Sequence, residues 1–129
     1  MSSPVSGNIA LENIRVRRDE FVHIWREAAR QEIELSDRHG TDWYLSAVVQ
    51  TCRWMAAVPP RTALCGGQTR SPVTERSCRA RPELIDIECA ALAQRQAERL
   101  DRPDWLAGVE ATFRWAWRGD GLPPVPRQG

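Results

Sequence analysis

The chain has 129 residues, which is enough for one domain with a core of its own and hardly enough for two. Its 18 basic and 17 acidic side chains give a net charge of +1, which argues against a strongly electrostatic nucleic-acid binder, because such proteins carry a clear basic excess. Every basic side chain is arginine, as GC-rich codon usage in a bacterial source would produce. The planar, forked donors of arginine suit carboxylate and phosphate partners.

No apolar run reaches the roughly 18 residues that a membrane span needs. Residues 1–8 lack the basic start and the apolar stretch of a signal peptide. We therefore expect a cytoplasmic protein with no membrane partner. In that compartment its four cysteines are expected to be reduced thiols: Cys52, Cys65, Cys78 and Cys89.

The apolar pattern predicts a single all-α domain over residues 1–129, with four main helices arranged as two related helical hairpins in a bundle-like fold. The expected parts in chain order are a flexible leader (1–8), a first hairpin (9–58), a long irregular loop (59–80), a second hairpin (81–119) and an extended tail (120–129). Proline, glycine, serine and threonine punctuate the loop, where no helical period survives.

The first predicted helix runs from about residue 9 to residue 38, and a break inside it is an alternative because about 30 residues is long for one helix. Its buried face repeats at helical spacing and consists of Phe21, Ile24, Trp25 and Ala28. The second predicted helix spans about residues 42 to 57, with Thr41 as its N-cap and Pro59 after its end. Its apolar stripe consists of Leu45, Val48, Cys52 and Met55.

The third predicted helix covers about residues 82 to 100, and Pro82 suits its first position. The helix macrodipole explains the carboxylates near its start without catalysis: Glu83, Asp86 and Glu88. The fourth predicted helix begins within residues 101–103 and runs to about Arg118, followed by glycines. Its stripe consists of Leu106, Val109, Phe113 and Ala116.

The second and fourth predicted helices resemble each other in sequence. With one residue skipped, DWYLSAVVQTCRW (42–54) matches DWLAGVEATFRW (104–115), so that the apolar stripes coincide. Equal spacing means an equivalent buried face, which predicts a duplication that packs around a pseudo-twofold axis. The alternative is a chance likeness between two amphipathic helices in a chain rich in Trp and Arg.

An arginine–tryptophan pair recurs late in both copies, as Arg53 with Trp54 and as Arg114 with Trp115. Each of these tryptophans lies one position off the apolar stripe. A wide core would bury them, and we favour that interpretation. If they are exposed instead, the two pairs form two equivalent patches with the composition of interface hot spots, so these four residues are the candidate interaction site.

The loop carries the main basic concentration outside the helices, which consists of Arg70, Arg76, Arg79 and Arg81. These arginines are the candidate nucleic-acid contacts. Their spacing is irregular and no aromatic residues alternate with them to stack on bases, so a nucleic-acid role is an alternative that we do not favour.

A second alternative is a thiol or metal sensor that uses Cys65 and Cys78, the two cysteines of the loop. The chain has no Cys-x-x-Cys pair, so we predict no metal site. Cys52 and Cys89 fall on helical core stripes, where a free cysteine acts as a small apolar side chain.

No recognisable catalytic motif occurs in the chain. It has neither a Gly-x-Ser-x-Gly turn nor a phosphate-binding loop, since CGGQTRS lacks the Gly-Lys-Ser/Thr ending. We therefore predict no catalytic residues and no cofactor. The leading hypothesis is a non-enzymatic protein-interaction or regulatory module with a protein partner or a second copy of itself.

Overall fold

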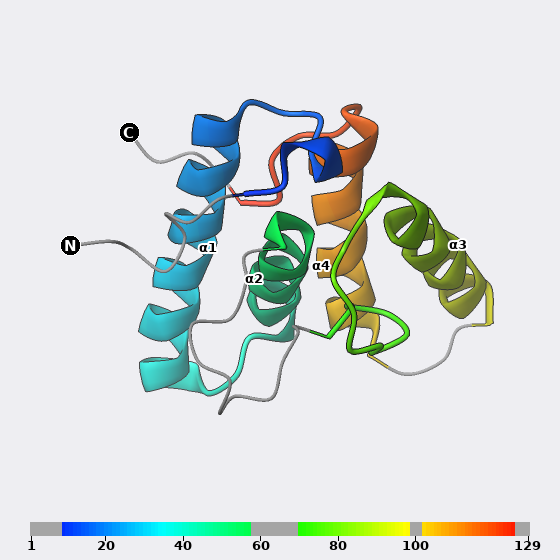
Figure 1. Ribbon diagram of the computed structural model, residues 1–129. Coiled ribbons are helices and arrows are strands. Elements are labelled where there is room, and N and C mark those ends of the chain that lie inside the picture. Colours follow the sequence, from blue (N-terminus) through cyan, green and yellow to red (C-terminus); the bar gives the residue numbers. More distant parts are fainter. Residues whose placement is uncertain (1–8, 58–69, 99–101, 126–129) are drawn as a thin grey trace.

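The computed structural model describes residues 9–57, 70–98 and 102–125 (Figure 1). Regular structure in these ranges is helical, apart from one isolated bridge between Arg70 and Ser77. A 3₁₀ turn, η1 (Leu11–Asn13), precedes the α-helices α1 (Arg18–His39), α2 (Trp43–Ala56), α3 (Pro82–Glu98) and α4 (Pro103–Phe113), and a π-helical turn, η3 (Arg114–Arg118), continues α4. The all-α prediction is confirmed. The predicted leader, the first half of the predicted loop (59–69) and the end of the predicted tail lie outside the described residues.

The first predicted helix contains the break that its length made plausible. Asn13 is fully buried, and its Nδ2 donates to the carbonyl oxygens of Met55 and Ala80, at 2.9 Å each. Ile14 is extended, and α1 starts only at Arg18. The buried amide ties η1 to the end of α2 and to the segment before α3. The chain therefore leaves the helical path here because tertiary hydrogen bonds outweigh local helix propensity.

The second predicted helix is found, with a different N-cap. The Asp42 side chain, rather than that of Thr41, accepts a hydrogen bond from the Leu45 backbone N–H at 2.9 Å, so the Thr41 prediction is wrong. Asp42 has the extended backbone typical of an N-cap. Ala57 ends the helix in the left-handed conformation, with φ of +53°.

The four helices pack in the order α1, α2, α4, α3 (Figure 1). α2 and α4 form the centre, α1 packs on α2, and α3 packs on α4. Each hairpin is antiparallel, whereas α2 and α4 start at the same end of the molecule, where the Trp43 and Trp105 rings lie 6.4 Å apart.

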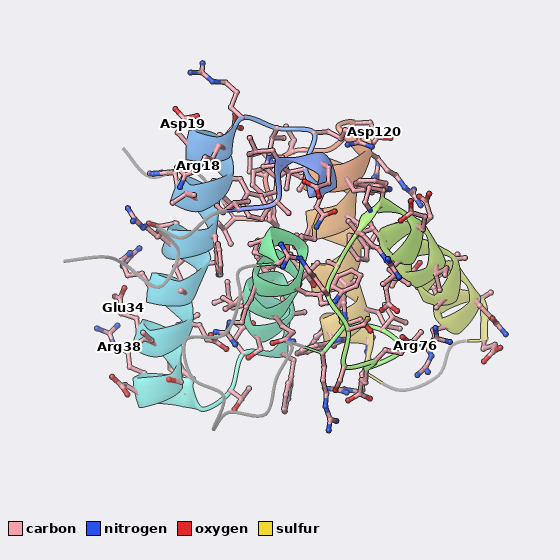
Figure 2. All side chains as sticks on the ribbon, viewed as in Figure 1. Arg18, Asp19, Glu34, Arg38, Arg76 and Asp120 are labelled. Atoms are coloured by element: carbon pink, nitrogen blue, oxygen red, sulfur yellow. The ribbon has the colours of Figure 1, made fainter. Side chains whose placement is uncertain are left out.

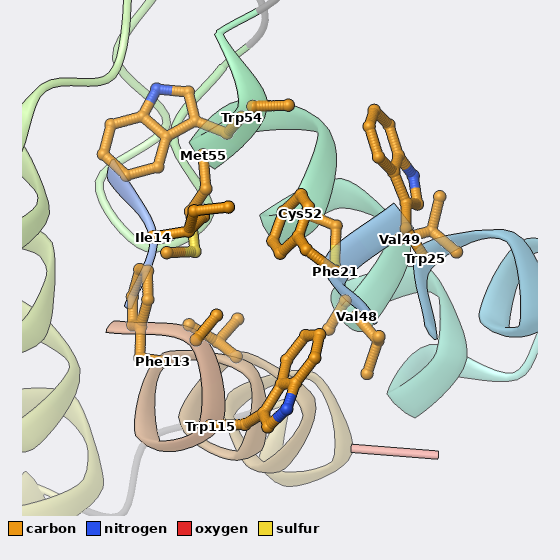
Figure 3. Close-up of a cluster of buried hydrophobic side chains, with 14 of the residues drawn as sticks. Ile14, Phe21, Trp25, Val48, Val49, Cys52, Trp54, Met55, Phe113 and Trp115 are labelled. Atoms are coloured by element: carbon orange, nitrogen blue, oxygen red, sulfur yellow. The ribbon is translucent and has the colours of Figure 1, made fainter. Parts of the chain in front are cut away.

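The predicted apolar stripes of α1, α2 and α4 are all buried. The core is rich in aromatic rings: Phe21 stacks on Trp115 with centroids 5.8 Å apart and meets Trp25 edge-to-face at 6.0 Å (Figure 3). Charged side chains such as Glu34 and Arg38 lie on the outer surface of α1 (Figure 2).

Candidate functional site

The two predicted surface patches do not form, because their tryptophans are in the core. Trp54 is 1% exposed and Trp115 is 2% exposed. The Trp54 indole N–H donates to the Cys78 carbonyl oxygen at 3.0 Å, which fixes the ring against the chain before α3. Trp115 and Trp54 therefore extend the core on a second buried face, as the favoured interpretation held, while Arg53 and Arg114 remain on the surface.

A different tryptophan–arginine surface lies at the opposite end of the central helices. We call Trp43, Trp105 and Arg102 the tryptophan–arginine cluster. The Arg102 guanidinium lies 4.8 Å from the centroid of the Trp105 ring and 5.6 Å from that of Trp43. Trp43 is 52% exposed, and the half-buried Trp105 donates its indole N–H to the Pro72 carbonyl oxygen at 2.8 Å. Two indoles and one guanidinium are thus held together at the surface.

The backbone of Arg102 is left-handed, with φ of +68° and ψ of +49°. This conformation costs a non-glycine residue about 1 to 2 kcal/mol. It occurs directly before Pro103, the first residue of α4, and it places the guanidinium over both indoles. The two cation–π contacts contribute about 0.5 to 1 kcal/mol each at an exposed site, which offsets part of that cost.

A cavity of about 180 Å³ adjoins the cluster. Its lining includes Trp105 and three arginines, which are Arg70, Arg95 of α3 and Arg102. One carboxylate, that of Glu75, also lines it. Within the described residues, none of these three arginines forms an ion pair. The described lining of the cavity therefore carries more positive than negative charge.

One wall of the cavity is the end of the predicted loop, and a buried carboxylate fixes it in place. Glu88 is 2% exposed, and its Oε1 accepts from the backbone N–H groups of Val73 at 2.8 Å and Thr74 at 3.1 Å. The Thr74 hydroxyl donates to Oε2. The Gln50 side-chain amide donates to the Arg70 carbonyl oxygen at 2.7 Å. We call the segment that these bonds hold the 70–77 turn.

Glu88 corrects the sequence interpretation of the α3 carboxylates. It lies in the second turn of α3 rather than at the start of the helix, and it points inward. Ile85, Cys89 and Leu92 are also buried, so Glu88 belongs to their stripe. The sequence could have predicted this role, because Glu88 occupies a core position on the apolar stripe of its helix. A buried carboxylate at such a position requires hydrogen-bond partners.

The four candidate nucleic-acid arginines are exposed, but they do not converge on one site. Arg70 lines the cavity, whereas Arg76, Arg79 and Arg81 do not (Figure 2 labels Arg76). Arg95, Arg102 and Trp43 were not among the residues predicted from the sequence. The pair of tryptophans at equivalent helix starts was visible in the sequence, but their contact with each other and with Arg102 depends on how α2 and α4 pack.

The cysteines divide by burial. Burial raises the pKa of the Cys52 thiol, and it is also the largest cause of the raised pKa of the Cys89 thiol. Cys78 is partly exposed, and Cys65 lies outside the described residues, so the sensor hypothesis remains a prediction. No cluster of three or more His, Cys, Asp or Glu side chains suited to a metal occurs in the ranges that the structure describes.

None of the described helices combines the length and the apolar character needed to cross a bilayer. Comparisons of the chain with protein-family models, with curated proteins and with solved structures found no significant match.

Proposed function

We propose that the chain is a non-enzymatic protein-interaction module and that the tryptophan–arginine cluster is its contact surface. The observation that carries the proposal is the half-exposed Trp43 ring, which is held in place by Trp105 and Arg102. Tryptophan and arginine are the residues most enriched among interface hot spots.

The cluster is organised before any partner binds. Trp105 is fixed by its hydrogen bond to Pro72, and Arg102 is fixed by the start of α4 and by its two ring contacts. Side chains that are already ordered lose less conformational entropy on association, so more of their contact energy appears as affinity. The partner is another protein or a second copy of the chain.

The other two hypotheses have less support. A nucleic-acid role would use the four loop arginines together, but Arg70 alone among them lines the cavity. A sensor role depends on Cys65, which lies outside the described residues. The cytoplasmic location and the internal duplication remain predictions.

A photo-crosslinking residue tests the proposed surface. We would introduce p-benzoylphenylalanine in place of Trp43 in the full chain, produce it in the native host, and irradiate the cells. The matched control replaces Leu11, which is 57% exposed and apolar and lies in η1, beside the other end of α2.

We expect a discrete covalent adduct from position 43 and none from position 11, and we expect Arg102→Ala to reduce its yield. An adduct with twice the mass of the chain identifies a second copy as the partner. Position 43 giving no adduct, or the same adducts as position 11, would contradict the proposal.

A further inference from the structure

We infer that the cavity beside the tryptophan–arginine cluster accepts a carboxylate side chain from an acidic peptide segment. The inference rests on the proposed function, since it gives the chemistry of the partner at that surface. Its starting point is the placement of Arg70, Arg95 and Arg102 around one cavity of about 180 Å³.

The charge of the lining favours an anion. Three arginines and one acidic residue, Glu75, line the cavity, and the three arginines form no ion pair within the described residues. Guanidinium groups normally find carboxylate or phosphate partners, because their forked donors match two oxygens at once. Three arginines that have no ion pair among the described residues are therefore suited to bind an oxyanion.

The surroundings favour a carboxylate on a peptide over a nucleic-acid backbone. Asp104 lies two residues from Arg102, and Glu98 lies three residues from Arg95. These exposed carboxylates place negative charge close in sequence to two of the three arginines, and the net charge of the whole chain is only +1, whereas binding a run of phosphates favours a continuous basic surface. A single acidic side chain needs only the three arginines that line the cavity.

The neighbouring cluster favours a peptide for a second reason. The exposed face of Trp43 is apolar, and Arg102 belongs both to the cluster and to the cavity. A peptide with an acidic residue beside an apolar residue would place the carboxylate on the arginines and the apolar side chain on the indole. Such a peptide would use a tryptophan contact and an arginine contact together, and both residue types are enriched in hot spots.

Glu75 allows a test in which one substitution should tighten anion binding and another should weaken it. Glu75 lines the cavity, and its negative charge opposes an incoming anion. Glu75→Gln removes that charge with little change in shape, so we expect it to tighten binding by about twofold. Arg95→Gln removes an attractive charge, so we expect it to weaken binding by about fivefold, the change that about 1 kcal/mol produces. Damage to the fold cannot account for tighter binding.

The probe is a hexaglutamate peptide, with hexaglutamine as the uncharged control. Binding to the full chain would be followed at low salt through the NMR signals of the arginine Nε–H groups, which report each guanidinium separately. Arg76→Gln is the matched control variant, because Arg76 is an exposed arginine of the 70–77 turn that does not line the cavity.

We expect hexaglutamate to shift the signals of Arg70, Arg95 and Arg102, hexaglutamine to shift none of them, and Arg76→Gln to bind as the unmodified chain does. Hexaglutamate that gives no shift, or binds Arg95→Gln equally well, would overturn the inference. Tighter binding of a thymidine hexanucleotide with the same arginine dependence would overturn it in favour of a nucleic acid. Equal shifts with inorganic phosphate alone would show that no peptide is required and would also overturn it.

The crosslinking experiment separates this inference from the proposed function. If the position-43 adduct forms and Arg95→Gln leaves its yield unchanged, the interaction surface stands and the carboxylate site fails. If hexaglutamate binds with the expected pattern and no adduct forms, the carboxylate site stands and the proposed interaction surface fails.

Discussion

Gly108 of α4 faces Ala47 of α2 at the closest approach of the two central helices. A β-carbon on Gly108 would lie 2.8 Å from the Ala47 Cβ and 2.5 Å from the Tyr44 carbonyl oxygen. Gly108 and Ala47 are equivalent positions in the alignment of the two helices, as are Trp105 and Trp43, and both equivalent pairs are in contact. Contact between equivalent residues of parallel helices is the arrangement that a pseudo-twofold axis between α2 and α4 would produce.

Gly108→Ala should destabilise the protein by about 2 kcal/mol, because the added methyl group meets backbone of α2 that has no room to move. Helix propensity alone predicts a more stable variant, since alanine is better than glycine in a helix by about 1 kcal/mol. Urea unfolding of both chains measures the difference. A higher urea midpoint for the variant would show that α2 and α4 do not pack this closely.

Glu88→Ala should cost about 1 to 3 kcal/mol, since it leaves the buried N–H group of Val73 and that of Thr74 without their acceptor. Hydrogen exchange at these two amides should accelerate more than exchange in α2. Glu83→Ala is the matched control, because Glu83 is an exposed carboxylate of the same helix. Equal effects of the two substitutions would mean that Glu88 does not hold the 70–77 turn.

Glu27 should make stability depend on pH in the acid range. Hydrogen bonds from Arg30, and then from Gln31, lower the pKa of its carboxyl from 4.5 to about 2. The folded chain therefore favours the ionised form more than the unfolded chain does. Its contribution is complete above about pH 4.5 and is lost as the pH falls towards 2.

NMR titration of the Glu27 carboxyl tests this directly. Arg30→Gln should return its pKa towards 4.5, and Glu27→Gln should flatten the dependence of the urea midpoint on pH between 4.5 and 2. A Glu27 carboxyl that titrates near 4.5 in the unmodified chain would refute the prediction.

Among the cysteines in the described ranges, Cys78 should be the first to react with iodoacetamide at pH 8. Burial raises the pKa of the Cys52 thiol and of the Cys89 thiol, so both have little thiolate and little access to the reagent, whereas Cys78 is partly exposed. Peptide mass spectrometry after short pulses measures the order. Cys52 should react only when urea unfolds the chain, and alkylation of Cys52 as fast as Cys78 in the native protein would contradict its burial.

Much of the fold could be predicted because it depends on local patterns. Apolar side chains at intervals of three and four residues specify a helix and its buried face together, and the residues chosen in this way, such as Val48 and Val109, are fully buried. Pro82 begins its helix as expected, and Pro103 begins α4, within the range predicted for its start, since proline suits the first position. The break at Asn13 could not be located, because its hydrogen-bond partners lie 42 and 67 residues away in the chain.

The interaction residues proposed from the sequence lie at the opposite end of the central helices from the tryptophan–arginine cluster, and their tryptophans, Trp54 and Trp115, are buried. The sequence by itself determined that this chain is helical, which faces are apolar, and that Trp and Arg are abundant. Only the tertiary structure decided that Trp54 is buried while Trp43 is exposed, and that Arg70, Arg95 and Arg102 share one cavity. The physical reason is that periodicity determines on which face of its own helix a residue lies. Whether that residue is exposed, and which distant residues lie beside it, depends on the other segments that pack against the helix.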